Sequence, residues 1–163
     1  MNQVLLIIDA QQELIEGNEA VGPVFNKENL IITINSVIER AIEANVPIIF
    51  VRDLDVSNGK GNGFEVHEGI HVPLGAKVFD KAATNAFYGT GLLHYLQTKD
   101  INHIVIMGCE TQHCIDSAVR TATINGFDVT LVGDGHSTCG NDVLKHEQII
   151  QHHNKTLHGH YNV

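Results

Sequence analysis

The amino-acid sequence predicts an α/β fold in which a doubly wound, mostly parallel sheet carries helices on both faces, as in Rossmann-like proteins. Two patterns support this prediction. Short apolar runs are near-continuous rather than alternating, which is typical of strands buried on both faces. Between these runs lie helix-length segments with apolar residues three and four positions apart. Strands and helices therefore alternate along the chain, as parallel sheets require.

The elements can be placed in order. Strands are expected over residues 4–8, 47–51, 75–79, 103–107 and 127–132, of which 75–79 has the weakest pattern. Helices are expected over residues 30–42, 91–96, 115–122 and 142–157. Residues 53–73 are rich in glycine and poor in apolar side chains, so we expect a long loop there, and long loops inside compact domains are often functional.

Composition limits the class of protein. The 163 residues, 43% of them hydrophobic and 18% charged, indicate one globular domain over 1–163 and exclude disorder and fibrous repeats. A formal net charge of −9 disfavours nucleic acid and anionic membrane surfaces as partners. Three cysteines without metal-finger spacing indicate free thiols in a reducing compartment. With no signal-peptide pattern or membrane-length apolar run, we expect a cytoplasmic protein.

Reactive side chains follow several of the expected strands. Active sites of such sheets lie beyond the carboxyl ends of the strands, where Asp9, Lys81 and Cys114 all fall. Cys114 lies in the first turn of an expected helix, where the helix dipole favours a thiolate and a lowered thiol pKa. Plainer interpretations are a helix cap or salt bridge for Asp9 and a packed thiol for Cys114, the interpretation adopted for Cys109 and Cys139.

Three segments carry a resemblance to a known family. Asp9 after the first strand, the stretch 81–92 and the stretch 108–115 resemble the isochorismatase-like cysteine hydrolases, from the first strand through Ser137. The resemblance implies an Asp-Lys-Cys catalytic triad of Asp9, Lys81 and Cys114. It also implies a three-layer fold with a mostly parallel, six-stranded sheet, whose last strand would fall around residues 160–163.

The resemblance also implies roles for single residues. Asp9 would act as general base and then acid, and Lys81 would hold Asp9 and stabilise the thiolate of Cys114. The oxyanion hole would consist of the backbone N–H groups of Glu110 and Cys114, next to a peptide that is cis in relatives. His67, in a Glu-x-His element, and Phe87, after Lys81, would line the substrate pocket.

One departure from the family concerns metal binding. Nicotinamidases of this family hold a metal through an Asp-x-His pair after the second strand, but here the segment reads Asp53-Leu54-Asp55, without the histidine. We therefore expect no metal and no other cofactor. A cation held by Asp53, Asp55, His67 and His71 stays an alternative. The histidines of the C-terminal segment indicate a surface or subunit interface.

Together these observations predict a hydrolase that cleaves a C–N amide bond of a small-molecule substrate through a covalent thioester. The chain is expected to form a homo-oligomer, a dimer or a tetramer, as family members commonly do. Two alternatives stay open. One is hydrolysis of an enol ether such as isochorismate, without a covalent intermediate, and the other is a non-catalytic member that only binds a ligand.

Overall fold

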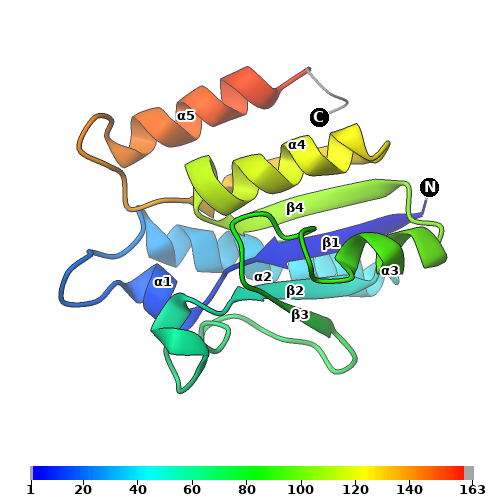
Figure 1. Cartoon of the computed structure of the whole chain (residues 1–163), viewed down its shortest axis with the longest axis horizontal. Coiled ribbons are helices and arrows are strands. Elements are labelled where there is room, and N and C mark those ends of the chain that lie inside the picture. The colour runs from blue at the N-terminus through cyan, green and yellow to red at the C-terminus, as the bar shows by residue number, and fades with distance from the viewer. Residues whose placement is uncertain (1, 160–163) are drawn as a thin grey trace.

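The computed structural model describes residues 2–159, in which five parallel strands form one sheet (Figure 1). The strands are β1 (Gln3–Ile8), β2 (Ile48–Asp53), β3 (Lys77–Lys81), β4 (His103–Cys109) and β5 (Asp128–Ser137), in the spatial order β3-β2-β1-β4-β5. This confirms the α/β fold and all the strands expected from apolar runs. The sheet has five strands rather than six, and the sixth, expected around 160–163, lies outside the described residues.

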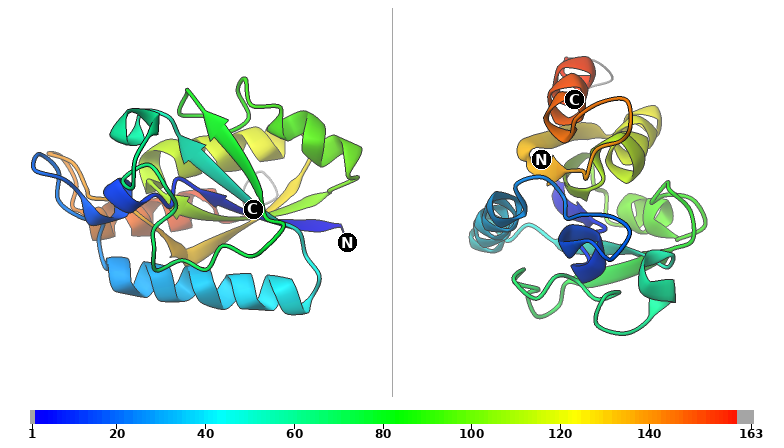
Figure 2. Two further views of the ribbon diagram at one scale, coloured as in Figure 1. Left: turned by 90° about the horizontal axis from the view of Figure 1, so that it is seen from below. Right: turned by 90° about the vertical axis from the view of Figure 1, so that its left-hand side faces the viewer.

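Helices cover both faces of the sheet. They are α1 (Gln12–Glu16), α2 (Lys27–Glu43), α3 (Leu92–Thr98), α4 (Asp116–Ile124) and α5 (His146–Leu157), with a 3₁₀ turn η1 (Val56–Gly59) and a π turn η2 (Thr111–Ile115). Figure 2 shows α2 beneath the sheet and α3 and α4 above it. The sequence missed only the short α1 among these helices. No helix within residues 2–159 is long and apolar enough to span a bilayer.

Side chains of the central strand divide between two apolar cores. Val4, Leu6 and Ile8 of β1 pack with α3 and α4 on one face, whereas Leu5 and Ile7 pack with α1 and α2 on the other. Each of these five side chains is at most 1% exposed. Burial on both faces explains why the sequence of β1 is apolar at successive positions rather than at alternate ones.

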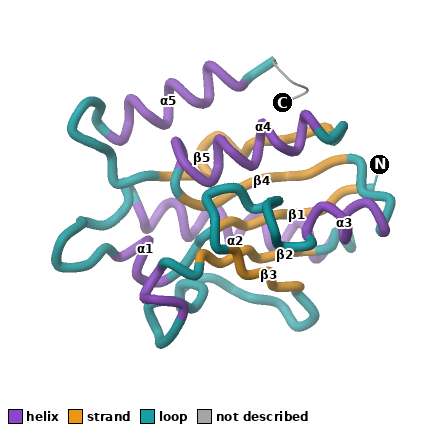
Figure 3. The backbone as a smooth tube through the Cα atoms, in the orientation of Figure 1, coloured by secondary structure: helices purple, strands orange, loops and turns teal. Residues whose placement is uncertain are grey.

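The long loop after β2 is folded against α1 and is drawn in teal in Figure 3. Gln11 and Val66 form an antiparallel bridge, and the N–H of Gln12 donates to the carbonyl of Glu65 at 2.8 Å. The amide Nε2 of Gln11 also donates to the carbonyl of Phe64 at 2.8 Å. These bonds hold the loop and α1 together at the carboxyl ends of β1 and β2.

Strand β4 approaches β1 closely at Gly108. The φ angle of Gly108 is 124°, and a Cβ atom at this position would lie 1.9 Å from the carbonyl oxygen of Ile8. Only glycine avoids both the clash and the unfavourable backbone conformation. This contact sets the spacing of the two strands immediately before Asp9 and Cys109.

Replacing Gly108 by alanine is therefore expected to lower the free energy of unfolding by about 2 kcal/mol or more. Gly126→Ala is the matched control, because Gly126 also has a positive φ of 87° but a Cβ atom there would have no neighbouring atom within 4 Å. We expect that control to lose about 1 kcal/mol. Urea denaturation of both variants measures the difference, and equal losses would show that the contact with Ile8 is unimportant.

Candidate active site

Three distant parts of the chain place Asp9, Lys81 and Cys114 side by side. Asp9 directly follows β1, Lys81 ends β3, and Cys114 lies in η2 after β4. The Lys81 ammonium nitrogen lies 2.9 Å from Oδ2 of Asp9 and donates to Sγ of Cys114 at 3.4 Å. The structure thus brings together all three residues that the sequence grouped as a triad.

The backbone at Asp9 is unusual for a residue other than glycine. Its φ angle is 51°, in the left-handed region, and its N–H donates to the carbonyl of Val51 at 2.8 Å. Such conformations persist only where the surroundings hold them, and they are common at functional sites. This bend turns the Asp9 carboxylate out of the strand direction and toward Lys81.

Asp53 is a fourth member of this cluster. Lys81 donates a hydrogen bond to Oδ2 of Asp53, its partner in the register of β2 and β3. Oδ1 of Asp53 in turn accepts the backbone N–H of Asp55 at 2.9 Å. Sequence reasoning considered Asp53 only as a metal ligand. Its place opposite Lys81 in neighbouring strands could have been found only from the strand register.

Burial dominates the electrostatics of the Asp9–Lys81 pair. Both residues are 1% exposed. Desolvation raises the pKa of Asp9 to about 6, although the charge of Lys81 opposes this shift. Burial alone would lower the pKa of Lys81, but the negative charge of Asp9 and the hydrogen bond with Asp53 act against burial, so that pKa is raised and the ammonium stays charged. Within residues 2–159 neither carboxylate oxygen of Asp9 receives a well-aligned hydrogen bond.

The thiol of Cys114 is protonated in the free protein. Burial, followed by the negative charge of Asp9, raises its pKa to about 12 and outweighs the attraction of Lys81. The lowered thiol pKa expected from the sequence is therefore wrong. Cys114 is the fourth residue of the π turn η2 and not part of the first turn of an α-helix, since α4 begins only at Asp116.

The turn that carries Cys114 begins with a cis peptide bond between Cys109 and Glu110, as the family resemblance implied. The carbonyl of Glu110 accepts the N–H groups of His113 and Ile115 at 3.1 and 3.2 Å. This compact turn carries the backbone N–H groups of both Glu110 and Cys114, the two that the sequence analysis assigned to an oxyanion hole.

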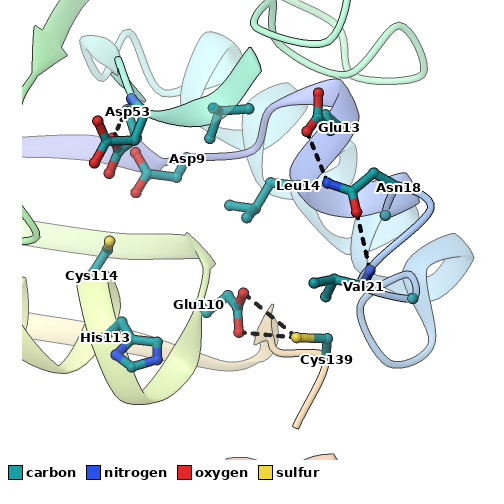
Figure 4. Close-up of a pocket in the computed structure, with 14 residues that line it drawn as sticks. Asp9, Glu13, Leu14, Asn18, Val21, Asp53, Glu110, His113, Cys114 and Cys139 are labelled. Atoms are coloured by element: carbon teal, nitrogen blue, oxygen red, sulfur yellow. Dashed lines mark hydrogen bonds between the residues drawn. The ribbon is translucent and has the colours of Figure 1, made fainter. Parts of the chain in front are cut away.

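A cavity of about 330 Å³ opens onto Asp9 and Cys114 (Figure 4). Its wall is formed by α1 and the loop after it, the end of β2 and the segment that follows, and residues after β1, β4 and β5. Its lining residues are Asp9, Glu13, Leu14, Gly17, Asn18, Val21, Gly22, Asp53, Asp55, Val56, Glu110, His113, Cys114 and Cys139. A cavity of this size suits a small molecule.

The two residues expected to bind substrate lie elsewhere. His67 is buried with its Nε2 2.9 Å from Oε1 of Glu16, while its Nδ1 accepts the N–H of Gly69. Phe87 packs against the apolar core on the face covered by α3 and α4. Neither is among the lining residues of the cavity. The loop after β2 folds back onto α1, which directs His67 toward α1 and away from the cavity.

The carboxylates and histidines that the sequence analysis considered as ligands of a cation do not lie close together. His67 contacts Glu16, and the backbone N–H of His71 donates to Asn35. Among the residues that the structure describes, only the oxygens of Asp9 and Asp53 and the sulfur of Cys114 lie close enough to share a metal ion, within 4.8 Å of one another. The ammonium of Lys81 already contacts all three of these residues. A metal ion there would face a buried positive charge, so this donor set fits an ammonium and not a metal.

Sequence reasoning also missed the side chain of Glu110. It had used only the backbone of this residue, yet Oε2 of the carboxylate accepts the hydroxyl of Thr138 at 2.7 Å and the carboxylate lines the cavity. The signal was available, because Glu110 is an acid directly after an apolar strand, the same pattern that singled out Asp9.

Similarity to known proteins decides the family. The Isochorismatase domain matches residues 3–156, nearly the whole chain. This chain belongs to the isochorismatase family.

Several relatives of this family are similar in sequence. The uncharacterized isochorismatase family protein YrdC of Bacillus subtilis is 33% identical over 82 residues, which cover 50% of this chain and 43% of that protein. A probable inactive nicotinamidase of Arabidopsis thaliana is 28% identical over 156 residues, covering 82% of this chain and 79% of that protein. Streptothricin hydrolase of Streptomyces noursei is 24% identical over 141 residues. The match covers 83% of this chain but only 54% of that enzyme.

Solved structures share the fold over nearly the whole chain. An isochorismatase family protein superposes with a TM-score of 0.91 at 25% identity, covering 98% of this chain and 95% of that one. The N-carbamoylsarcosine amidase of Thermoplasma acidophilum superposes with a TM-score of 0.76 at 21% identity, covering 96% of this chain and 93% of that one. At this identity the amidase establishes similarity of fold alone.

The electrostatics of Cys114 can be tested by alkylation. Asp9→Asn is expected to shift the pH profile of the reaction of Cys114 with iodoacetamide to lower pH, because removing the negative charge of Asp9 lowers the thiol pKa. Mass spectrometry of the Cys114 peptide measures the rate. Glu39→Gln, which removes an exposed charge on α2, should leave the rate unchanged. A pH profile in Asp9→Asn that is unchanged or shifted to higher pH would contradict the assigned cause.

Proposed function

We propose that this protein is a cysteine hydrolase that cleaves a C–N amide bond of a small molecule through a thioester. The observation that carries this proposal is the contact of Asp9, Lys81 and Cys114 at the edge of the cavity. A nucleophile with an adjacent base can carry out covalent amide hydrolysis, and a nearby cation can stabilise the thiolate that forms as the proton leaves. A streptothricin hydrolase among the sequence relatives and an amidase among the structural neighbours support a hydrolytic reaction.

In the first step, Sγ of Cys114 attacks the carbonyl carbon and its proton passes to Asp9. With a pKa of about 6, Asp9 is mostly a carboxylate at neutral pH and can accept this proton. Lys81 stays charged and lies 3.4 Å from the sulfur, so it stabilises the negative charge as the proton leaves. The raised thiol pKa means that attack and proton transfer occur together rather than from a preformed thiolate.

In the following steps, Asp9 first donates this proton and later accepts another from water. It protonates the leaving nitrogen, the C–N bond breaks, and the acyl group stays on Cys114 as a thioester. A water molecule then attacks the thioester and gives a proton to Asp9. The C–S bond breaks, the carboxylic acid product leaves, and the proton returns to the sulfur.

Backbone donors complete the proposed machinery. Each tetrahedral intermediate carries a negative oxygen, which we assign to the N–H groups of Glu110 and Cys114 in the turn after β4. Loss of one such donor typically lowers turnover by about 10²- to 10³-fold. Enol-ether hydrolysis would need an acid but no sulfur nucleophile. A cysteine within contact range of both a base and a cation therefore favours amide cleavage.

Removal of the nucleophile tests the proposal directly. Cys114→Ala should lower ammonia release from small amides by at least about 10³-fold, because the covalent route is lost. Acid quenching of the wild-type protein during turnover should trap an acyl group on Cys114, visible by mass spectrometry. Full activity in Cys114→Ala would favour the enol-ether type of reaction. A wild-type protein that turns over no amide or enol ether would instead be a ligand-binding member.

The pH dependence tests the role of Asp9. The ratio kcat/KM should rise with pH through about 6 and then level off, because only ionised Asp9 can take the thiol proton. Asp9→Asn should remove most of the activity, and Glu39→Gln should keep the wild-type profile. Activity that depends on Cys114 but is constant between about pH 5 and 8 would assign the base to another group.

A further inference from the structure

We propose that the cavity selects a positively charged substrate, a small amide carrying an ammonium or guanidinium group that binds the side chain of Glu110. This inference rests on the proposed function, since it concerns the same cavity. The cavity is identified as a site by Cys114 and by Asp9, whose fully buried carboxylate faces it without a well-aligned hydrogen bond. The negative charge of the cavity wall is a separate observation, and it indicates the chemistry of the substrate.

The wall of the cavity is acidic. Five carboxylates contribute to it: Asp9, Glu13, Asp53, Asp55 and Glu110. No lysine or arginine lies among the residues that form this wall in the described chain. Lys81 lies behind it with a side chain that is 0% exposed, and it contacts both Asp9 and Asp53. Five acidic side chains are therefore balanced by only one buried ammonium, that of Lys81, and the cavity presents a net negative potential.

The carboxylate of Glu110 is oriented but not neutralised. It accepts the Thr138 hydroxyl at 2.7 Å and, more weakly, the Gln112 amide at 3.4 Å. The Cys139 thiol donates to it at 3.6 Å, and burial, followed by the charge of Glu110, raises the pKa of that thiol, so it stays a donor. All of these donors are uncharged, and within residues 2–159 Glu110 makes no ion pair. The protein thus holds this carboxylate in place and leaves its charge available to a ligand.

Glu13 strengthens the negative potential from the α1 side. Its carboxylate accepts hydrogen bonds from the Ser57 hydroxyl and, at 3.0 Å, from the Asn18 amide. These two hydrogen bonds, in that order, lower the pKa of Glu13, so it stays ionised at neutral pH. Both donors are neutral, so the charge of Glu13 also remains.

The position of Glu110 suits a bifunctional substrate. It precedes Cys114 by one turn of chain, and Figure 4 shows its carboxylate on the same side of the cavity as Cys139, with Leu14 pointing into the space between Glu110 and Asp9. A substrate with its carbonyl carbon at Cys114 would place its aliphatic chain along Leu14 and Val21 and its cationic end at Glu110. A dicarboxylate such as isochorismate would instead meet like charges on every side.

Three amides of equal chain length test this inference. They are 6-aminohexanamide, which is a cation, hexanamide, which is neutral, and adipic acid monoamide, which is an anion. We expect kcat/KM for ammonia release to fall in that order, with at least about a tenfold preference for the cation over the neutral amide. The preference should shrink as salt is added, because salt screens charges.

Glu110→Gln keeps the backbone and the shape of the side chain but removes its charge. The ratio of kcat/KM for the cationic amide to that for the neutral amide should fall by at least about fivefold, mainly through KM. Glu39→Gln changes the net charge equally at an exposed position on α2 and should keep the wild-type ratio. An unchanged ratio in Glu110→Gln would overturn the role of this residue.

A binding measurement separates failure of this inference from failure of the proposed function. Each amide is added to the wild-type protein during alkylation of Cys114 by iodoacetamide, a neutral reagent. Protection by 6-aminohexanamide alone, without ammonia release, would support cation selection and contradict amide hydrolysis. Faster turnover or better protection with the neutral or anionic amide would overturn cation selection and leave hydrolysis standing. Absence of protection by all three would also overturn it.

Discussion

The buried ammonium of Lys81 joins groups that arrive from different strands of the sheet. It contacts Asp9 after β1, Asp53 at the end of β2, and Cys114 after β4. Burial of a lone charge is unfavourable, so each member needs the others to remain inside the protein. The same interaction that completes the carboxyl end of the sheet also fixes the spacing of sulfur and carboxylate. Structure and chemistry therefore depend on one side chain.

Much of the fold could be predicted because the burial of an element determines which of its residues are apolar. Strands covered on both faces must be apolar at successive positions, and β1 with Val4–Ile8 shows this plainly. The positions of Asp9, Lys81 and Cys114 beyond such strands placed them at one edge of the sheet, and the family resemblance then grouped them as a triad. The five-residue α1 could not be predicted, since so short a helix has too few turns to show an apolar stripe.

The electrostatic state of the site could not be predicted from the sequence. Whether Cys114 is a thiol or a thiolate depends on its burial and on its distance from Asp9, and neither can be obtained from the sequence alone. His67 was misplaced for a similar reason, because the fold of a long loop depends on hydrogen bonds such as Gln11 to Phe64. The role proposed for the side chain of Glu110 could be inferred only from its hydrogen bonds with Thr138 and Cys139.

The order of the strands has a consequence for biosynthesis. β1 lies in the middle of the sheet, yet Gln3 pairs with His103, so β1 is synthesised long before its second neighbour β4. Until then its apolar side chains lack one of their partners, and contacts of such long sequence separation form slowly. Until β4 has been synthesised, the apolar side chains of β1 are therefore exposed to intermolecular contacts that favour aggregation.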